Sequence, residues 1–144
     1  MDMMKDNAFQ TSMENHITDI VSYLLTNEQH FGLVCKLENV DFNPPLPDHI
    51  KETLNQITLF FLAGYTYEST RLEGGFISFE AGFGSENFGS IVTLPVLAVM
   101  QLIVEETPIF VNIAQPRPKE TDGSVDKSMA ALMANPENRK LFKK

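Results

Sequence analysis

The sequence predicts an α+β fold that is mostly β: a small two-sheet half-open barrel or sandwich with an N-terminal helix. One helical pattern of apolar residues lies near the start of the chain. Short runs typical of strands follow it, separated by Gly and Pro. The chain has 144 residues, 43% of them hydrophobic, with 11 Phe and no Trp, which is enough for one core packed largely by Phe. Short strands beside one strong helix are typical of the α+β class.

The helix is predicted over residues 12–26. Thr11 and Glu14 stand three residues apart, the spacing of a capping box at its start. A stripe of apolar residues is more often core than interface, although a helix this near the terminus can also pair with a second copy. The apolar residues that recur at the spacing of one helix face are Ile17, Ile20, Val21, Leu24 and Leu25.

Two strands and a proline-rich loop are predicted next. Residues 31–37 alternate between apolar and other positions, which indicates a half-buried strand. Residues 43–47 contain three prolines and must form a loop, because proline cannot donate to a sheet ladder. Residues 48–56 add a helical turn or two. Residues 57–62 are continuously apolar, and we expect a strand covered on both faces.

A β-hairpin is predicted in the middle of the chain. Residues 65–72 alternate and predict a strand, and Gly74 with Gly75 forms a turn signal before a second strand over residues 76–81. Residues 90–94 predict a further strand. Pro95 then has the position of the first turn of an apolar helix. A last strand is expected over residues 109–113.

The character of the chain changes after residue 114. Residues 1–114 carry 4 Lys or Arg against 15 Asp or Glu, net −11, whereas residues 115–144 carry 7 against 4, net +3. We therefore expect a folded domain over 1–114 and a linker with a basic tail over 115–144, with a short helix over 128–134. The chain ends in a basic cluster around two large apolar residues, as in a short docking motif: Arg139, Lys140, Leu141, Phe142, Lys143 and Lys144.

Composition excludes several classes of protein. The net charge of −8 argues against nucleic-acid binding by the acidic body. No apolar run approaches the length of a membrane helix, and the N-terminus has no signal-peptide pattern. The single cysteine, Cys35, fits a reducing compartment. We expect a soluble, cytoplasmic protein.

No catalytic, metal or cofactor site is predicted. His16, His30 and His49 lie in separate polar contexts without metal-ligand spacing. Cys35 lies on the apolar face of its strand and is expected to be a buried, inert thiol. Glu105 and Glu106 are adjacent, so their side chains point apart. We expect the protein not to be an enzyme and to need no cofactor.

Glycines beside aromatic residues indicate a second kind of site. Phe83 and Phe88 flank Gly82, Gly84 and Gly89. One interpretation, which we favour from the residues alone, is a bulge that lets Phe83 reach the core. The other is a groove along which an extended peptide lays its main chain.

Five segments carry a family resemblance, and their order and spacing agree over about residues 22–106. They are 23–27, 33–37, the strand from 57, Phe79-Glu80-Ala81-Gly82-Phe83-Gly84, and 91–99 with its strand followed by Pro95. Together these segments resemble the stringent starvation protein B (SspB) family, adaptors of the ClpXP protease. The resemblance implies an Sm-like two-sheet fold, a homodimer formed through the N-terminal helix, and a groove for the ssrA degradation tag.

The resemblance also implies roles for particular residues. Phe79, Ala81, Gly82 and Phe83 would lie at the peptide-binding groove, and the basic cluster 139–144 would dock on the N-terminal domain of ClpX. The dimer contact would come from helix residues: Ile17, Ile20, Val21 and Leu24. Two features depart from the family. The linker is short, and Gly82 follows Ala81 where a basic side chain would pair an acidic peptide.

Two other functions compete with this one. A small acidic secretion or assembly chaperone would hold a partner protein in extended form, without dependence on the last six residues. A small hot-dog-type thioesterase would need a long central helix wrapped by a sheet. The strongest predicted helix is N-terminal, which counts against the thioesterase.

Overall fold

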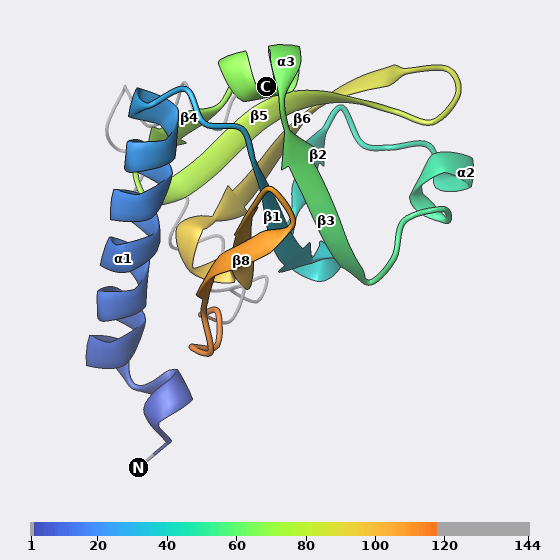
Figure 1. Cartoon of the computed structure of the whole chain (residues 1–144). Helices are drawn as coiled ribbons and strands as arrows, with labels where there is room; N and C mark the ends of the chain where they lie inside the picture. The colour runs from blue at the N-terminus through green and yellow to red at the C-terminus, as the bar shows by residue number, and fades with distance from the viewer. Residues whose placement is uncertain (1, 118–144) are drawn as a thin grey trace, which may run out of the picture.

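The structure, a computed structural model, describes residues 2–117 as one N-terminal helix and two antiparallel sheets (Figure 1). The helices are α1 (Asn7–Thr26), α2 (Asp48–Lys51) and α3 (Gly64–Glu68), with 3₁₀ turns η1 (Met3–Lys5), η2 (Leu37–Asn39) and η3 (Val96–Ala98). The strands are β1 (Phe31–Lys36), β2 (Asp41–Asn43), β3 (Ile57–Leu62), β4 (Arg71–Glu73), β5 (Phe76–Phe83), β6 (Phe88–Pro95), β7 (Gln101–Val104) and β8 (Thr107–Val111).

Each sheet has four strands. Sheet A has the order β3-β1-β7-β8, and sheet B has the order β2-β6-β5-β4. No strand is shared between the two orders, so the described chain forms an unclosed pair of sheets rather than a complete barrel. Figure 1 shows α1 on one side of the sheets and α2 on the opposite side. The predicted α+β, mostly β class is confirmed.

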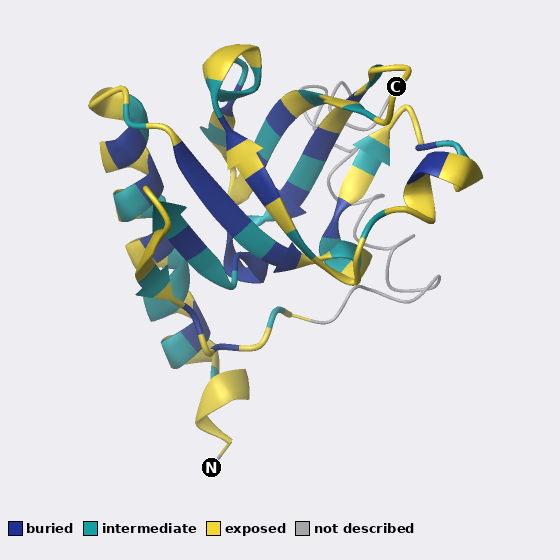
Figure 2. Cartoon of the chain, turned by 45° about the vertical axis from the view of Figure 1, so that its right-hand side comes forward, coloured by how far each residue is buried: buried dark blue, intermediate teal, exposed yellow. Residues whose placement is uncertain are grey.

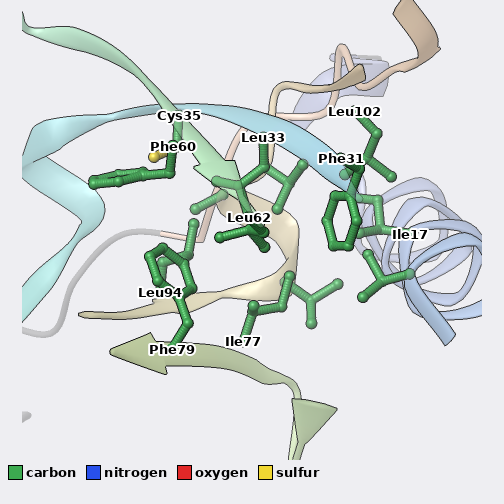
Figure 3. Packing of buried hydrophobic residues seen from close by; sticks show 14 of the residues in the cluster. Ile17, Phe31, Leu33, Cys35, Phe60, Leu62, Ile77, Phe79, Leu94 and Leu102 are labelled. Carbon is green, nitrogen blue, oxygen red and sulfur yellow. The ribbon is translucent and has the colours of Figure 1, made fainter. Parts of the chain in front are cut away.

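The core lies between the inner faces of the two sheets and is closed at one end by α1. Figure 3 shows Ile17 and Phe31 at the end nearest α1, with Phe60 at the other end. From α1, Ile17, Val21 and Leu24 are buried in this core. Since burying one such side chain stabilises a fold by roughly 1.5–3 kcal/mol, the apolar stripe of α1 holds the helix against the sheets.

The start of α1 differs from the prediction. The helix begins at Asn7, and the Asp6 side chain caps it by accepting a hydrogen bond from the Phe9 backbone N–H at 3.1 Å. Thr11 and Glu14 are not its cap, because they lie inside the helix and contact the Arg117 guanidinium instead. The predicted capping box was therefore wrong, although the helix itself was right.

The strand predicted over residues 65–72 was also wrong. Gly64 has a φ of 57°, which ends β3 and starts the short helix α3 before β4. Within α3, the Tyr67 hydroxyl donates to the carbonyl oxygens of Leu24 and Leu25 at 2.9 and 3.1 Å. Tyr67 thus satisfies carbonyls at the end of α1, a tertiary contact that alternation in the sequence does not reveal.

Pro95 does not start an α-helix. A single 3₁₀ turn, η3, follows it and leads directly into β7. This segment crosses from sheet B to sheet A beneath α1, and its residues are buried all round. The Asn112 side chain donates to the carbonyls of Leu97 and Val99 at 3.0 and 2.9 Å, which supplies partners that a helix would otherwise provide.

The strands predicted over residues 31–37, 57–62, 76–81, 90–94 and 109–113 correspond to β1, β3, β5, β6 and β8 within a few residues, whereas β2 and β7 were not predicted. Gly74 and Gly75, with φ of 57° and 82°, form the two-residue turn between β4 and β5, where Glu73 pairs with Phe76. The expectation that β3 is covered on both faces was wrong, because its residues alternate between buried and exposed (Figure 2). Among residues 2–117, no helix has the length and apolar character needed to span a membrane.

Candidate functional site

Four phenylalanine rings meet where the two sheets approach each other at β2 and β3. Phe60 of β3 lies 6.5 Å from Phe42 of β2, 5.4 Å from Phe79 and 6.4 Å from Phe83 of β5, measured between ring centroids. Phe42 and Phe83 are 5.6 Å apart. Most of these pairs meet edge to face, the arrangement that the ring quadrupoles favour. We call these four residues the aromatic cluster.

The aromatic cluster runs from the core to the surface. Phe79 and Phe60 are only 1% and 6% exposed, whereas Phe42 and Phe83 are half-buried. Ala81 lies between Phe79 and Phe83 on the same inward face of β5 and is also half-buried. Three of the predicted groove residues, Phe79, Ala81 and Phe83, are therefore together at the end of the sheet pair opposite α1, which we call the open end and where Phe42 and Phe83 are half-buried.

Gly82 has a different position from its neighbours. It lies on the outward face of β5, opposite Ala81. A Cβ atom at Gly82 would stand 1.7 Å from Oδ1 of Asn87, so the missing side chain makes room for Asn87 in the turn before β6. The pairing of β5 with β6 runs unbroken from Phe76 to Phe83, which overturns the predicted bulge.

The segment before β3 forms one side of this open end. The His49 ring nitrogen Nε2 lies 2.9 Å from the Glu86 carboxylate and joins α2 to the β5–β6 turn. Ile50 is buried and faces Gly84, where a Cβ would be 3.3 Å from its side chain. Nearby, the Ser90 hydroxyl donates to the Pro44 carbonyl at 2.9 Å. Since Ser90 pairs with Ala81, these contacts hold the proline loop and α2 beside the aromatic cluster.

The charges near the site are mostly acidic. Asp41 precedes Phe42 in β2, Asp48 begins α2, and Glu86 lies in the β5–β6 turn. Strands β5 and β6 contain no Lys, Arg or His. Strands β5 and β6 therefore present apolar and aromatic side chains here, without basic groups that could form ion pairs.

A shallow pocket of about 430 Å³ lies on the outward face of sheet B. In it a hydrogen bond from Tyr65 to Glu80, and the charge of that carboxylate, raise the pKa of the Tyr65 hydroxyl. The sequence does not predict this pocket, because residues 65–72 have the alternation of a strand, whereas Tyr65 lies in α3. The residues that line it are Tyr65, Glu68, Ser69, Arg71, Ser78, Phe79, Glu80 and Ile91.

Cys35 and the histidines lie apart from one another. Cys35 is fully buried, and desolvation raises the pKa of its thiol to about 12, so it stays protonated near neutral pH. The exposed His16 stacks on Phe110, and His30 lies beside Tyr67 with ring centroids 4.9 Å apart. In the part of the chain that the structure describes, no group of His, Cys, Asp or Glu is arranged to hold a metal ion.

The helix residues expected at a dimer contact face the chain's own core. Ile17, Val21 and Leu24 are buried there, and Ile20 packs against the same core from a half-buried position. Ile17, Val21 and Leu24 therefore have almost no surface left for a second copy while α1 stays in place, whereas Ile20 keeps part of its surface exposed. The large apolar side chain exposed on α1 is Tyr23.

The predicted docking cluster 139–144 lies outside the described residues. The last described residue, Arg117, contacts Glu14, Asn7 and Thr11 of α1 through its guanidinium group.

Comparison of the sequence with protein-family models found no match, and a search among curated proteins found none either.

Proposed function

We propose that this protein is a non-enzymatic, cytoplasmic adaptor that binds peptide degradation tags of the ssrA kind and tethers tagged proteins to the ClpXP protease. The observation that supports the proposal is the aromatic cluster beside Ala81, at the open end between the two sheets. The resemblance to SspB in the segments around Ala81 and Pro95 supports the same function.

The geometry suits an extended apolar peptide. Phe42 and Phe83 offer ring surface to a side chain that enters between the sheets, while Phe60 and Phe79 form the buried floor. We infer that the small side chain of Ala81 leaves room for a peptide side chain over this floor. Extended peptides are commonly recognised in this way, with side chains in pockets and the main chain along a strand.

Tethering needs a second contact, which we assign to the basic tail. Arg139, Lys140, Leu141, Phe142, Lys143 and Lys144 combine charge with two large apolar side chains, and we propose that they dock on the N-terminal domain of ClpX. Two modest contacts joined through one adaptor raise the effective concentration of the tagged protein at the protease. A homodimer would double each contact.

A degradation assay tests this function. A tagged fluorescent reporter, kept well below the concentration at which ClpXP alone degrades it efficiently, is incubated with ClpXP and the full chain. We expect faster degradation with the full chain and no acceleration when residues 139–144 are deleted. Binding of the tag peptide should be the same for both proteins. No acceleration by the full chain, or equal loss of binding and delivery in the deletion, would contradict two separate modules.

A further inference from the structure

The outward face of sheet A is largely apolar across its four strands. The side chains that form it are Ile57, Leu59 and Phe61 of β3, Val34 of β1, Ile103 of β7 and Val111 of β8, together with the exposed Ile109 at the irregularity in the β7–β8 pairing. We call these seven residues the apolar outer face. Figure 1 shows β3 and β8 on the near side of the molecule. The water-exposed face of an antiparallel sheet normally carries mostly polar residues, whereas in the middle of this face Gln101, which pairs with Val34 and Val111, is the polar side chain among apolar ones.

The strand register makes the apolar outer face continuous. Leu59 pairs with Val34, and Phe61 and Ile103 pair with Gly32 from its two sides. A Cβ atom at Gly32 would stand only 2.8 Å from Cδ1 of Leu59. The Leu59 side chain therefore leans over the glycine and closes the gap between β3 and the middle of the sheet.

The size of this face is that of an interface. Ile57, Leu59 and Phe61 are 53%, 55% and 64% exposed. On β8, Ile109 and Val111 are 45% and 56% exposed. At roughly 100 Å² for each side chain, these five expose about 500 Å², at the upper end of the largest apolar patches on monomers. With the half-buried Val34 and Ile103 and a polar rim, the face approaches the roughly 800 Å² per partner of a standard interface.

Charge at the two ends of the sheet indicates the partner. Lys36 is exposed at one end, after Val34 on β1, and its pairing with Ile57 places it on the same outward face. Glu105 and Glu106 are exposed in the β7–β8 turn at the other end, because β7 runs antiparallel to β1. The face is thus apolar in its middle, basic at one end and acidic at the other. This pattern is complementary to itself when one copy is reversed.

We propose that the apolar outer face binds the same face of a second copy of this chain. The two-fold axis lies in the interface and perpendicular to the strands, so β3 of one copy packs on β3 of the other with the strand directions reversed. This arrangement places Lys36 of each copy near Glu105 and Glu106 of the other. The interface leaves α1 in its place against the core, and it does not depend on the proposed adaptor function.

Sedimentation of the full chain tests this interface, with matched variants on two surfaces. Phe61→Glu places a carboxylate in the apolar outer face, and Tyr23→Glu places one at an equally exposed aromatic residue on α1, since both are 64% exposed. Samples are compared from about 1 μM to about 500 μM, a range that detects dissociation constants down to weak dimers. Circular dichroism confirms that each variant is folded.

We expect the wild type and Tyr23→Glu to dimerise, and Phe61→Glu to raise the dissociation constant by about 100-fold or more, because each copy would then bury a carboxylate among apolar side chains of the other. Val111→Glu on β8 should act in the same way and serves if Phe61→Glu does not fold. A monomeric wild type, or dimers that persist in a folded Phe61→Glu or Val111→Glu variant, would overturn the proposal. Dimers lost only in Tyr23→Glu would assign the contact to α1.

An exchange of charges between Lys36 and the two glutamates tests whether the strands of the two copies run in opposite directions in the dimer. Lys36→Glu should weaken the dimer about tenfold, as expected for removal of a close charge pair and its replacement by repulsion. Adding Glu105→Lys and Glu106→Lys to that variant should restore the wild-type constant. If the combined variant dimerises no better than Lys36→Glu alone, the reversed arrangement is wrong.

Discussion

Phe60 of β3 and Phe83 of β5 meet edge to face, with ring centroids 6.4 Å apart and an interplanar angle of 89°. The two residues belong to different sheets, so their contact joins the sheets at the open end of the fold. Phe60 is buried there, whereas Phe83 is half-buried. The pair thus connects the core of the protein to the surface at which we propose that a peptide binds.

Replacing Phe83, the half-buried member of this pair, by alanine should weaken peptide binding. Phe83→Ala removes ring surface at the proposed groove, and we expect the dissociation constant for a tag peptide to rise about tenfold, the effect of losing about 1.4 kcal/mol of contact energy. Phe76→Ala on the outward face of the same strand is the control and should leave binding unchanged. Equal effects of the two variants would place the peptide elsewhere. Fluorescence anisotropy of a labelled tag peptide measures the dissociation constants of both variants.

The stripe of α1 should contribute to stability. Ile17→Ala removes a fully buried side chain, and we expect it to lower the free energy of unfolding by about 2–4 kcal/mol. Tyr23→Ala, on the exposed side of the same helix, should change it by less than about 0.5 kcal/mol. Urea unfolding gives both values. A small effect of Ile17→Ala would mean that α1 is not packed as described.

The contact between Gly82 and Asn87 predicts that a substitution at Asn87 restores stability lost by a substitution at Gly82. Gly82→Ala should destabilise the fold by about 1 kcal/mol or less, because the added Cβ displaces the exposed Asn87 side chain rather than backbone. Asn87→Gly removes that side chain and tolerates the local φ of 53°, so the double variant should regain most of the lost stability. If Asn87→Gly rescues nothing, the contact between the two residues is not the reason for the glycine. Thermal unfolding of the three variants provides the test.

The buried thiol predicts a dependence on alkaline pH. The pKa of Cys35 is raised from 9.0 to about 12 in the fold, so between these values the unfolded chain loses a proton that the folded chain keeps. The contribution of Cys35 to stability is therefore complete below pH 9 and declines as the pH rises above it. At about pH 10.5 the wild type should have lost about 2 kcal/mol more than Cys35→Ala, relative to neutral pH. Parallel pH curves for the two proteins would contradict the buried, protonated thiol.

Local patterns in the sequence predicted much of the fold. The 3.6-residue spacing of Ile17, Val21 and Leu24 identified α1, and the Gly74-Gly75 pair identified the β4–β5 turn, because each signal is contained in a few neighbouring residues. The prediction failed where distant residues decide the structure. Tyr67 lies in a helix that contacts Leu24, 43 residues earlier. The run after Pro95 is apolar because it is buried on every side beneath α1, rather than because it forms a helix.

The candidate site could be predicted only on one strand. The family resemblance grouped Phe79, Ala81 and Phe83, and the structure places all three on one face of β5. Phe42 and Phe60 were missed, because their contacts with β5 depend on how the two sheets are placed in space. The exposure of β3 was missed for a related reason. A continuous apolar run has the same pattern in a covered strand and in a strand at the edge of a sheet.

The most direct test of the proposed peptide-binding function is the titration of a fluorescent ssrA-type tag peptide with the full chain, followed by anisotropy. Ala81→Gln should fill the space over the aromatic cluster, and Ser78→Gln places the same side chain on the outward face of β5, in the shallow pocket. We predict saturable binding by the wild type and Ser78→Gln, and its loss in a folded Ala81→Gln variant. Absence of binding by the wild type, or unchanged binding by Ala81→Gln, would contradict the proposed function.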